Sequence, residues 1–234
     1  MRWKNVLFHP EEETAMTPDE IRGEIAEFRY KKTTAEIIQK SQDLDEDGKV
    51  FIECAAYILS NFMMTWSGPF KGVDVRSDGK IIGGEILTQC WDEIGSDVLS
   101  IRNSIRQSGH DRDRYLLELS DADRGKLVAR IWAMTKQLLP ITMSKSSYGL
   151  VVASKILFAV LPEIVLPVDN QQWKELFKTV DLGDIIHQMT DDIKQWEYDR
   201  QHNLNEVDLL HKLTTLPSVY NVMTMKAKSK LNHQ

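Results

Sequence analysis

The sequence predicts a mainly α-helical protein in which helices pack against one another. Three observations carry this prediction. Apolar residues recur at helical spacing along most of the 234-residue chain, several of these stretches start with helix-capping residues, and strand-like alternation is scarce. We expect a single helical unit over residues 1–234, with two closely packed lobes over 1–119 and 120–225 and a basic tail over 226–234.

Capping residues mark the helix starts in the first part of the chain. Thr17, Pro18 and Glu20 form the pattern of a capping box with proline in the first turn, which predicts a helix from residue 18. The Thr-Thr-Ala-Glu sequence at residues 33–36 predicts a second start of the same kind. Residues 50–65 are apolar on nearly all sides, which is typical of a helix at the centre of a core.

The glycine-rich stretch over residues 67–84 is the one non-helical excursion that the sequence predicts, with a hairpin around residues 77–79. Beyond it, Ser120 is expected to cap a long helix that ends near Leu139, and Lys226 is expected to begin a frayed end. Other apolar stretches at helical spacing predict helices over residues 86–94, 97–106, 150–161, 170–180, 185–196 and 206–213.

The composition excludes several classes of protein. Apolar residues make up 42% and charged residues 27% of the chain, which indicates a globular rather than a disordered protein. Acidic residues outnumber basic ones by 35 to 29, so a nucleic-acid partner would need a local basic face. Cys54 and Cys90 are too few for a disulfide framework or a cysteine zinc site, which favours reduced thiols in the cytoplasm. No apolar run approaches the ~20 residues of a membrane span, and we expect no signal peptide.

The stretch from Ser144 to Trp173 is the most informative for function. A polar turn ends at Gly149 and an apolar helix follows, after which a proline-bounded extended segment delivers Asp169 to the start of another helix. Residues 141–160 contain two lysines and no acid, so the local charge is positive although the whole chain is acidic.

This stretch resembles the helix-hairpin-helix DNA glycosylases, the superfamily that contains the 8-oxoguanine and adenine glycosylases. Residues 149–153 match the Gly-x-x-Thr-Ala end of the family's hairpin, with Val152 in place of threonine. The Pro-Val-Asp sequence that ends at Asp169 matches the segment that presents the family's catalytic aspartate, twenty positions after Gly149. The resemblance covers about 30 residues and implies a two-lobed helical fold with the substrate cleft between the lobes.

The departures from the family pattern restrict the chemistry. Ser147 stands where the first hairpin glycine is expected, and Val151 stands where the bifunctional members carry a lysine. The resemblance therefore implies a monofunctional enzyme that uses water and forms no Schiff base. No Cys-x-x-Cys pattern follows, so we expect neither the iron–sulfur cluster of some relatives nor any other cofactor.

The resemblance implies an enzyme that flips a base out of double-stranded DNA and hydrolyses its glycosidic bond. Asp169 would be catalytic, because a carboxylate beside the sugar stabilises the developing positive charge and can activate a water molecule. The partner would be double-stranded DNA with a damaged or modified base, such as a modified base of phage DNA, which would make this an antiviral defence protein. The predicted DNA contacts are Lys145, Ser146, Ser147, Gly149 and Lys155 for the backbone, and Asn170, Gln171 and Gln172 for a phosphate or the flipped nucleotide.

Aromatic residues at the end of the apolar helix add a further expectation. Most of them lie at helical spacing and are expected in the core, but Trp66 and Phe70 flank Gly68 and Pro69. These two are the candidates for stacking on a base.

Two other interpretations stay open. The first is a non-catalytic helical protein that binds DNA or acts in phage defence by interaction. A second basic patch competes with the one near Gly149 as a DNA-facing surface: Arg102, Arg106, Arg112 and Arg114. The second is a calcium-binding helical protein. Asp43, Asp45 and Asp47 have the spacing of the first half of an EF-hand loop, but Cys54 stands where the bidentate glutamate belongs.

Overall fold

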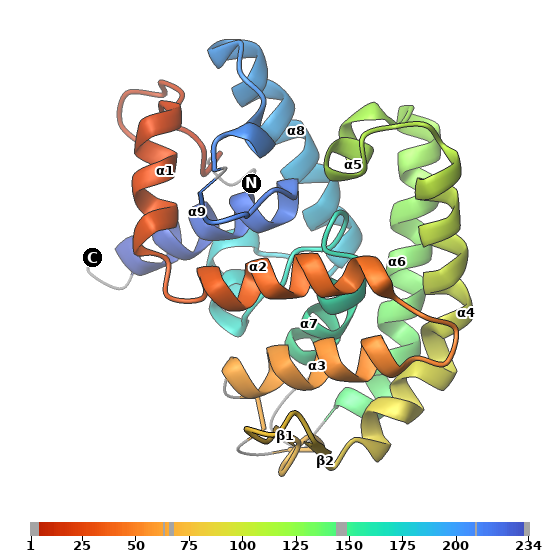
Figure 1. Ribbon diagram of the computed structural model, residues 1–234. Coiled ribbons are helices and arrows are strands. Elements are labelled where there is room, and N and C mark those ends of the chain that lie inside the picture. The colour runs from red at the N-terminus through yellow and green to blue at the C-terminus, as the bar shows by residue number, and fades with distance from the viewer. Residues whose placement is uncertain (1–4, 63, 66–67, 144–148, 209, 232–234) are drawn as a thin grey trace.

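A computed structural model describes residues 5–62, 64–65, 68–143, 149–208 and 210–231 (Figure 1). The protein is mainly helical, as predicted, and one cluster of buried apolar side chains draws on both halves of the chain. Within the described residues, no helix is both long and apolar enough to cross a bilayer. The helices are α1 (Pro18–Glu27), α2 (Lys31–Lys40), α3 (Lys49–Asn61), α4 (Glu85–Gln107), α5 (Tyr115–Glu118), α6 (Asp121–Thr142), α7 (Leu150–Val160), α8 (Leu182–Arg200) and α9 (Leu216–Leu231).

Short helical turns and one hairpin connect these helices. The 3-10 turns are η1 (Ser41–Asp43), η2 (Arg112–Arg114) and η4 (Leu204–Glu206), and η3 (Gln172–Phe177) is a π-helical segment. Strands β1 (Asp74–Val75) and β2 (Ile81–Ile82) pair antiparallel, with Asp74 opposite Ile82. The predicted hairpin around residues 77–79 is therefore confirmed.

Helices α3 and α7 form the centre of the molecule. They pack against each other, with α2 on one side of α3 and the antiparallel pair α4 and α6 beside them (Figure 1). Every residue of α7 except Val152 is buried. Such a buried helix is stabilised by tertiary packing and not by the intrinsic helix propensity of its residues. This explains why α7 contains Val, Ile and Phe, which are weak helix formers. The predicted lobes over 1–119 and 120–225 stay a prediction, since the buried cluster draws on both ranges.

The capping box at Thr17 is confirmed, and the one at residues 33–36 is wrong. Thr17 accepts from the Glu20 amide, and the Glu20 side chain bonds back to the Thr17 amide. The second helix instead begins at Lys31, so Thr33 and Thr34 lie inside it and are buried. Their burial against the core outweighs the weak local preference of threonine for a cap.

The two helices predicted over 86–94 and 97–106 are one continuous helix, α4. Gly95 does not interrupt it, because its missing side chain makes room for an indole: a Cβ there would lie 2.7 Å from Trp91 Cε2. The same ring covers Gly48, where a Cβ would lie 2.4 Å from Trp91 Cδ1. Trp91 thus fastens the start of α3 to α4 through two glycines.

The C-terminal part contains two wrong predictions and one confirmed cap. Ser120 accepts from the Asp123 amide and begins α6, as predicted. The helix predicted over 206–213 is replaced by a turn, because the buried Asp208 carboxylate accepts from the amides of His211 and Leu213. The end predicted to fray from Lys226 is helical to Leu231, and Lys226 pairs with a glutamate of α1.

Candidate functional site

The helix that follows Gly149 and the segment that precedes Asp169 are in contact in the structure. Gly149 begins α7, and Ser154 on the next turn binds the segment that precedes Asp169. Ser154 Oγ accepts from the Val168 amide at 3.1 Å and lies 3.2 Å from the Val168 carbonyl oxygen. This contact holds the aspartate segment against the first half of α7.

Gly149 has a steric reason to be glycine. Its φ of 76° lies in the left-handed region, and a Cβ would lie 2.5 Å from Thr142 Oγ1 and 2.9 Å from the Met143 nitrogen. Gly149 therefore lies in close contact with the end of α6. Of the predicted backbone contacts, Lys145, Ser146 and Ser147 lie outside the described residues.

Both carboxylate oxygens of Asp169 have partners. Oδ1 accepts from the amides of Gln171 (3.0 Å) and Gln172 (2.8 Å), and Gln172 Oε1 accepts from the Asp169 amide at 2.7 Å. This reciprocal pair is a capping box at the start of the helical turn that leads into η3. Oδ2 forms an ion pair with Lys228 of α9. The side chain is still 27% exposed.

Two lysines set the charge around Asp169. Burial opposes its ionisation, but the hydrogen bond from Lys228, the Gln172 amide and the nearby Lys155 charge outweigh burial and hold the pKa of Asp169 below its ordinary value. The carboxylate is therefore ionised at neutral pH. Lys228 was not among the predicted site residues, since α9 was not predicted and nothing in the sequence brings position 228 near position 169.

Lys155 and Gln172 are too buried for the DNA contacts predicted for them. Lys155 is 2% exposed; its Nζ lies 3.4 Å from the Val168 carbonyl oxygen and over the Phe62 ring. Gln172 is fully buried and donates to Thr224 at 2.6 Å. Both predictions are wrong for this conformation, and both residues instead hold the Asp169 segment. Asn170 is exposed and Gln171 is partly exposed, so they stay accessible.

The aromatic prediction fails for Phe70, which is 1% exposed and belongs to the hydrophobic core. A ring without an accessible face cannot stack on a base. Trp66 lies outside the described residues.

The EF-hand-like loop has structural roles. Asp43 ends η1, Asp45 Oδ1 accepts from the Val50 amide at 3.4 Å, and Asp47 pairs with Lys49. Gly48 is required by Trp91, as described above. Across the described part of the chain, no three Asp, Glu, His or Cys side chains are grouped so that they could hold a metal ion. The structure therefore does not bring Asp43, Asp45 and Asp47 together as ligands.

The second basic patch divides in two. Arg114 pairs with Glu197 through both terminal nitrogens at 2.8 Å and joins η2 to α8. Arg102, Arg106 and Arg112 instead line one cavity.

The chain matches no family model, no curated protein and no solved structure. Its function is therefore inferred from its residues and their geometry.

Proposed function

We propose that this protein is a monofunctional DNA glycosylase in which Asp169 acts on the sugar of a flipped nucleotide. The observation that carries the proposal is the Ser154–Val168 contact, which keeps an ionised, partly exposed carboxylate beside the helix that begins at Gly149. The helix-hairpin-helix motif, the two lobes and the cleft between them are part of the proposal.

The proposed chemistry assigns one task to each group. The helix start at Gly149 offers amides to a DNA phosphate without reading sequence. The Asp169 carboxylate stabilises the positive charge that develops on the deoxyribose and orients the attacking water. Lys155 and Lys228 keep that carboxylate ionised, and Lys228 must give up its hold on Oδ2 when the sugar arrives.

A second candidate is a DNA-binding protein without catalysis. It is favoured by the engagement of both oxygens of Asp169, since a carboxylate that caps a helix and pairs with a lysine has a sufficient structural role. This protein would bind DNA with a steep salt dependence and release no base.

Mass spectrometry of bases released from a panel of genomic DNAs, including phage DNAs with modified cytosine or thymine, separates the two candidates. The decisive variant is Asp169→Asn, because asparagine caps a helix as well as aspartate but carries no charge. Under the glycosylase proposal it binds DNA and folds normally but releases base at least about 100-fold more slowly.

Lys228→Met is the matched control, since it removes the same ion pair and leaves the carboxylate in place. It should retain base release within about tenfold of the unmodified protein. DNA binding without any released base, or equal release by Asp169→Asn and the unmodified protein, would leave only the binding function.

A further inference from the structure

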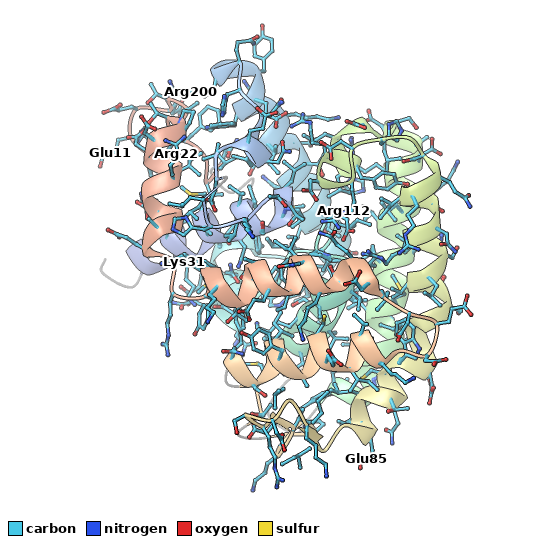
Figure 2. The ribbon with its side chains drawn as sticks, in the orientation of Figure 1. Glu11, Arg22, Lys31, Glu85, Arg112 and Arg200 are labelled. Carbon is cyan, nitrogen blue, oxygen red and sulfur yellow. The ribbon has the colours of Figure 1, made fainter. Side chains whose placement is uncertain are left out.

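A cavity of about 290 Å³ lies near the end of α7 that is further from Asp169. Its volume is close to the lower limit of small-molecule sites, which is about 300 Å³. Helix α4 supplies three of its seven lining residues, and Arg112 reaches it from η2 (Figure 2). The lining residues are Gln42, Arg102, Ile105, Arg106, His110, Arg112 and Glu163.

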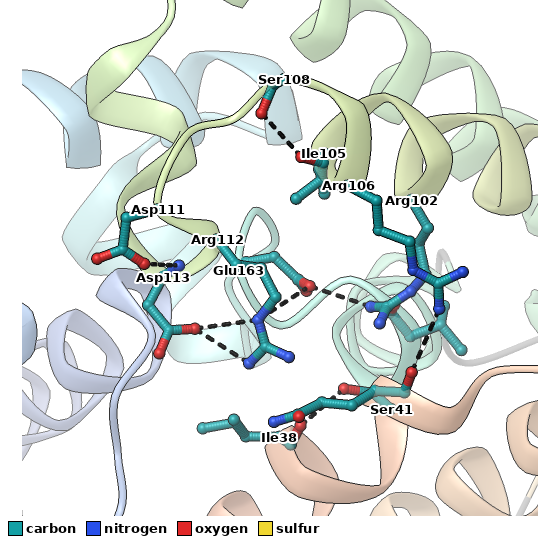
Figure 3. A network of polar contacts seen from close by, with 12 residues as sticks. Ile38, Ser41, Arg102, Ile105, Arg106, Ser108, Asp111, Arg112, Asp113 and Glu163 are labelled. Atoms are coloured by element: carbon teal, nitrogen blue, oxygen red, sulfur yellow. Dashed lines mark hydrogen bonds and ion pairs between the residues drawn. The ribbon is translucent and has the colours of Figure 1, made fainter.

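Glu163 is the buried carboxyl group of this cavity. Its Oε1 accepts from Arg102 Nη1 at 3.0 Å and lies 3.7 Å from Arg112 Nε (Figure 3). Its side chain is 1% exposed, and Oε2 has no hydrogen-bond partner among the described residues. A buried carboxylate oxygen without a partner is costly, so this atom calls for a hydrogen-bond donor.

Two guanidinium groups, those of Arg102 and Arg112, lie within 4 Å of this buried carboxylate, and Arg106 lines the same cavity. Arg112 is shared with Asp113, whose Oδ1 accepts from Arg112 Nη2 at 3.0 Å. Arg106 makes only a long hydrogen bond, 3.4 Å to the Gln42 carbonyl oxygen, and no carboxylate lies within ion-pair distance of it in the part of the chain that the structure describes. His110 completes the rim and pairs with Glu118 at 2.9 Å.

The guanidinium groups repel one another. Burial lowers the pKa of Arg102, Glu163 raises it, and the neighbouring charges of Arg112 and Arg106 lower it again. A bound anion would relieve this repulsion, and guanidinium forks fit the oxygens of a phosphate in a bidentate manner.

We propose that this cavity binds a small phosphate monoester that carries hydroxyl groups. The phosphate lies against Arg106 and Arg112, and a hydroxyl of the ligand donates to Glu163 Oε2. The site is independent of Asp169, so the proposal does not rest on the glycosylase function.

Calorimetric titration of the full chain at constant ionic strength tests the proposal with glycerol 3-phosphate and methyl phosphate. We expect saturable binding of glycerol 3-phosphate with a dissociation constant of about 0.1–1 mM. Methyl phosphate, which lacks the hydroxyl groups, should bind more weakly. Arg106→Gln, at an exposed position, should weaken binding about tenfold or more, as the loss of one charge-assisted hydrogen bond predicts.

Arg76→Gln is the matched control, because it removes one exposed arginine from the β-hairpin and should leave binding unchanged. Equal weakening by Arg76→Gln and Arg106→Gln, or no saturable binding up to about 10 mM, would overturn the proposal. Equal affinity for the two esters would overturn the role of Glu163. Binding of duplex DNA that depends on Arg106, without binding of either ester, would assign the cavity to a nucleic-acid phosphate instead.

Discussion

Lys155 shows at the residue scale how the surroundings of one side chain change its chemistry. Its amine is almost fully buried beside a carbonyl oxygen and an aromatic face. Its pKa is lowered to about 8, because burial and the neighbouring Lys228 charge outweigh the opposing effect of Asp169. The folded protein therefore binds this proton less tightly than the unfolded chain, in which a lysine keeps a pKa near 10.4.

The pH dependence of stability follows from this shift. Below pH 8 the Lys155 amine is protonated in both the folded and the unfolded protein, and the folded protein bears the full cost of a buried charge. Between pH 8 and 10.5 the folded protein releases this proton while the unfolded chain keeps it, so that cost disappears. The free energy of unfolding should therefore rise by roughly 2–3 kcal/mol from pH 7 to pH 10, relative to Lys155→Met. Urea unfolding of both proteins at the two pH values measures this difference. A difference that does not change with pH would contradict the shift.

The turn at Gly149 predicts opposite outcomes for two glycine substitutions. Gly149→Ala should lower the free energy of unfolding by roughly 2–4 kcal/mol, because a left-handed φ and a clash with Thr142 act together. Gly125→Ala, in the interior of α6 with no neighbouring atom within 4 Å, should raise it by about 0.5–1 kcal/mol. Thermal and urea unfolding compare the two, and equal effects would mean that position 149 is not strained.

At the scale of elements, the Arg102–Glu163 pair joins α4 to the chain that leaves α7. Arg102 Nη1 also donates to the Val160 carbonyl oxygen at 3.2 Å, so a cation lies at the C-terminal end of α7. Both side chains are buried. Removing one of them should therefore lower the free energy of unfolding more than removing both, because a single substitution leaves a buried charge without its partner.

A double-substitution cycle tests this matching. Arg102→Met should lower the free energy of unfolding by about 3–5 kcal/mol, because it leaves Glu163 buried with only a distant partner, Arg112. Adding Glu163→Met should recover most of the loss, since the buried charge is then removed. A double variant as unstable as the sum of the single variants would show that the two residues act independently.

The sequence predicted two helix starts correctly where local chemistry decides them. Thr17 and Ser120 start helices because their side chains satisfy backbone amides within the same turn. The continuity of α4 through Gly95 and the presence of α9 were not predicted. The Trp91 indole covers the glycine, and residues 216–224 of α9 are all buried, so no exposed polar face marks this stretch as a helix.

In the candidate site, too, some features could be predicted from the sequence and others depend on contacts between distant segments. The resemblance to the glycosylases implied that the Asp169 segment lies near the helix that follows Gly149, and the Ser154–Val168 contact agrees with that expectation. The burial of Lys155 and the approach of Lys228 depend on how α9 crosses the η3 segment, which no local pattern encodes.

At the scale of the whole molecule, the two ends of the chain close the fold together. Helix α9 packs against both α1 and the η3 segment (Figure 1). Lys226 pairs with Glu24, and Gln172 bonds to Asn221 at 3.3 Å. Near the start of the chain, Trp196 Nε1 donates to the Met16 carbonyl oxygen at 2.8 Å.

The packing of α9 against α1 and η3 predicts slow hydrogen exchange at the centre of α9. The amides of residues 219–224 should open with a free energy close to that of global unfolding, because all six residues are buried. Native-state exchange followed by mass spectrometry or NMR measures this value. Exchange as fast as that of an exposed terminal helix would mean that α9 does not belong to the cooperative unit.

The contact of Trp91 with Gly48 and Gly95 has a consequence for how this protein can diverge. Neither glycine has room for a methyl group while the indole is present. Trp91 must therefore be replaced by a smaller residue before positions 48 and 95 can accept residues with side chains. Among descendants of this sequence, the three positions should drift as a linked set across 47 residues of chain.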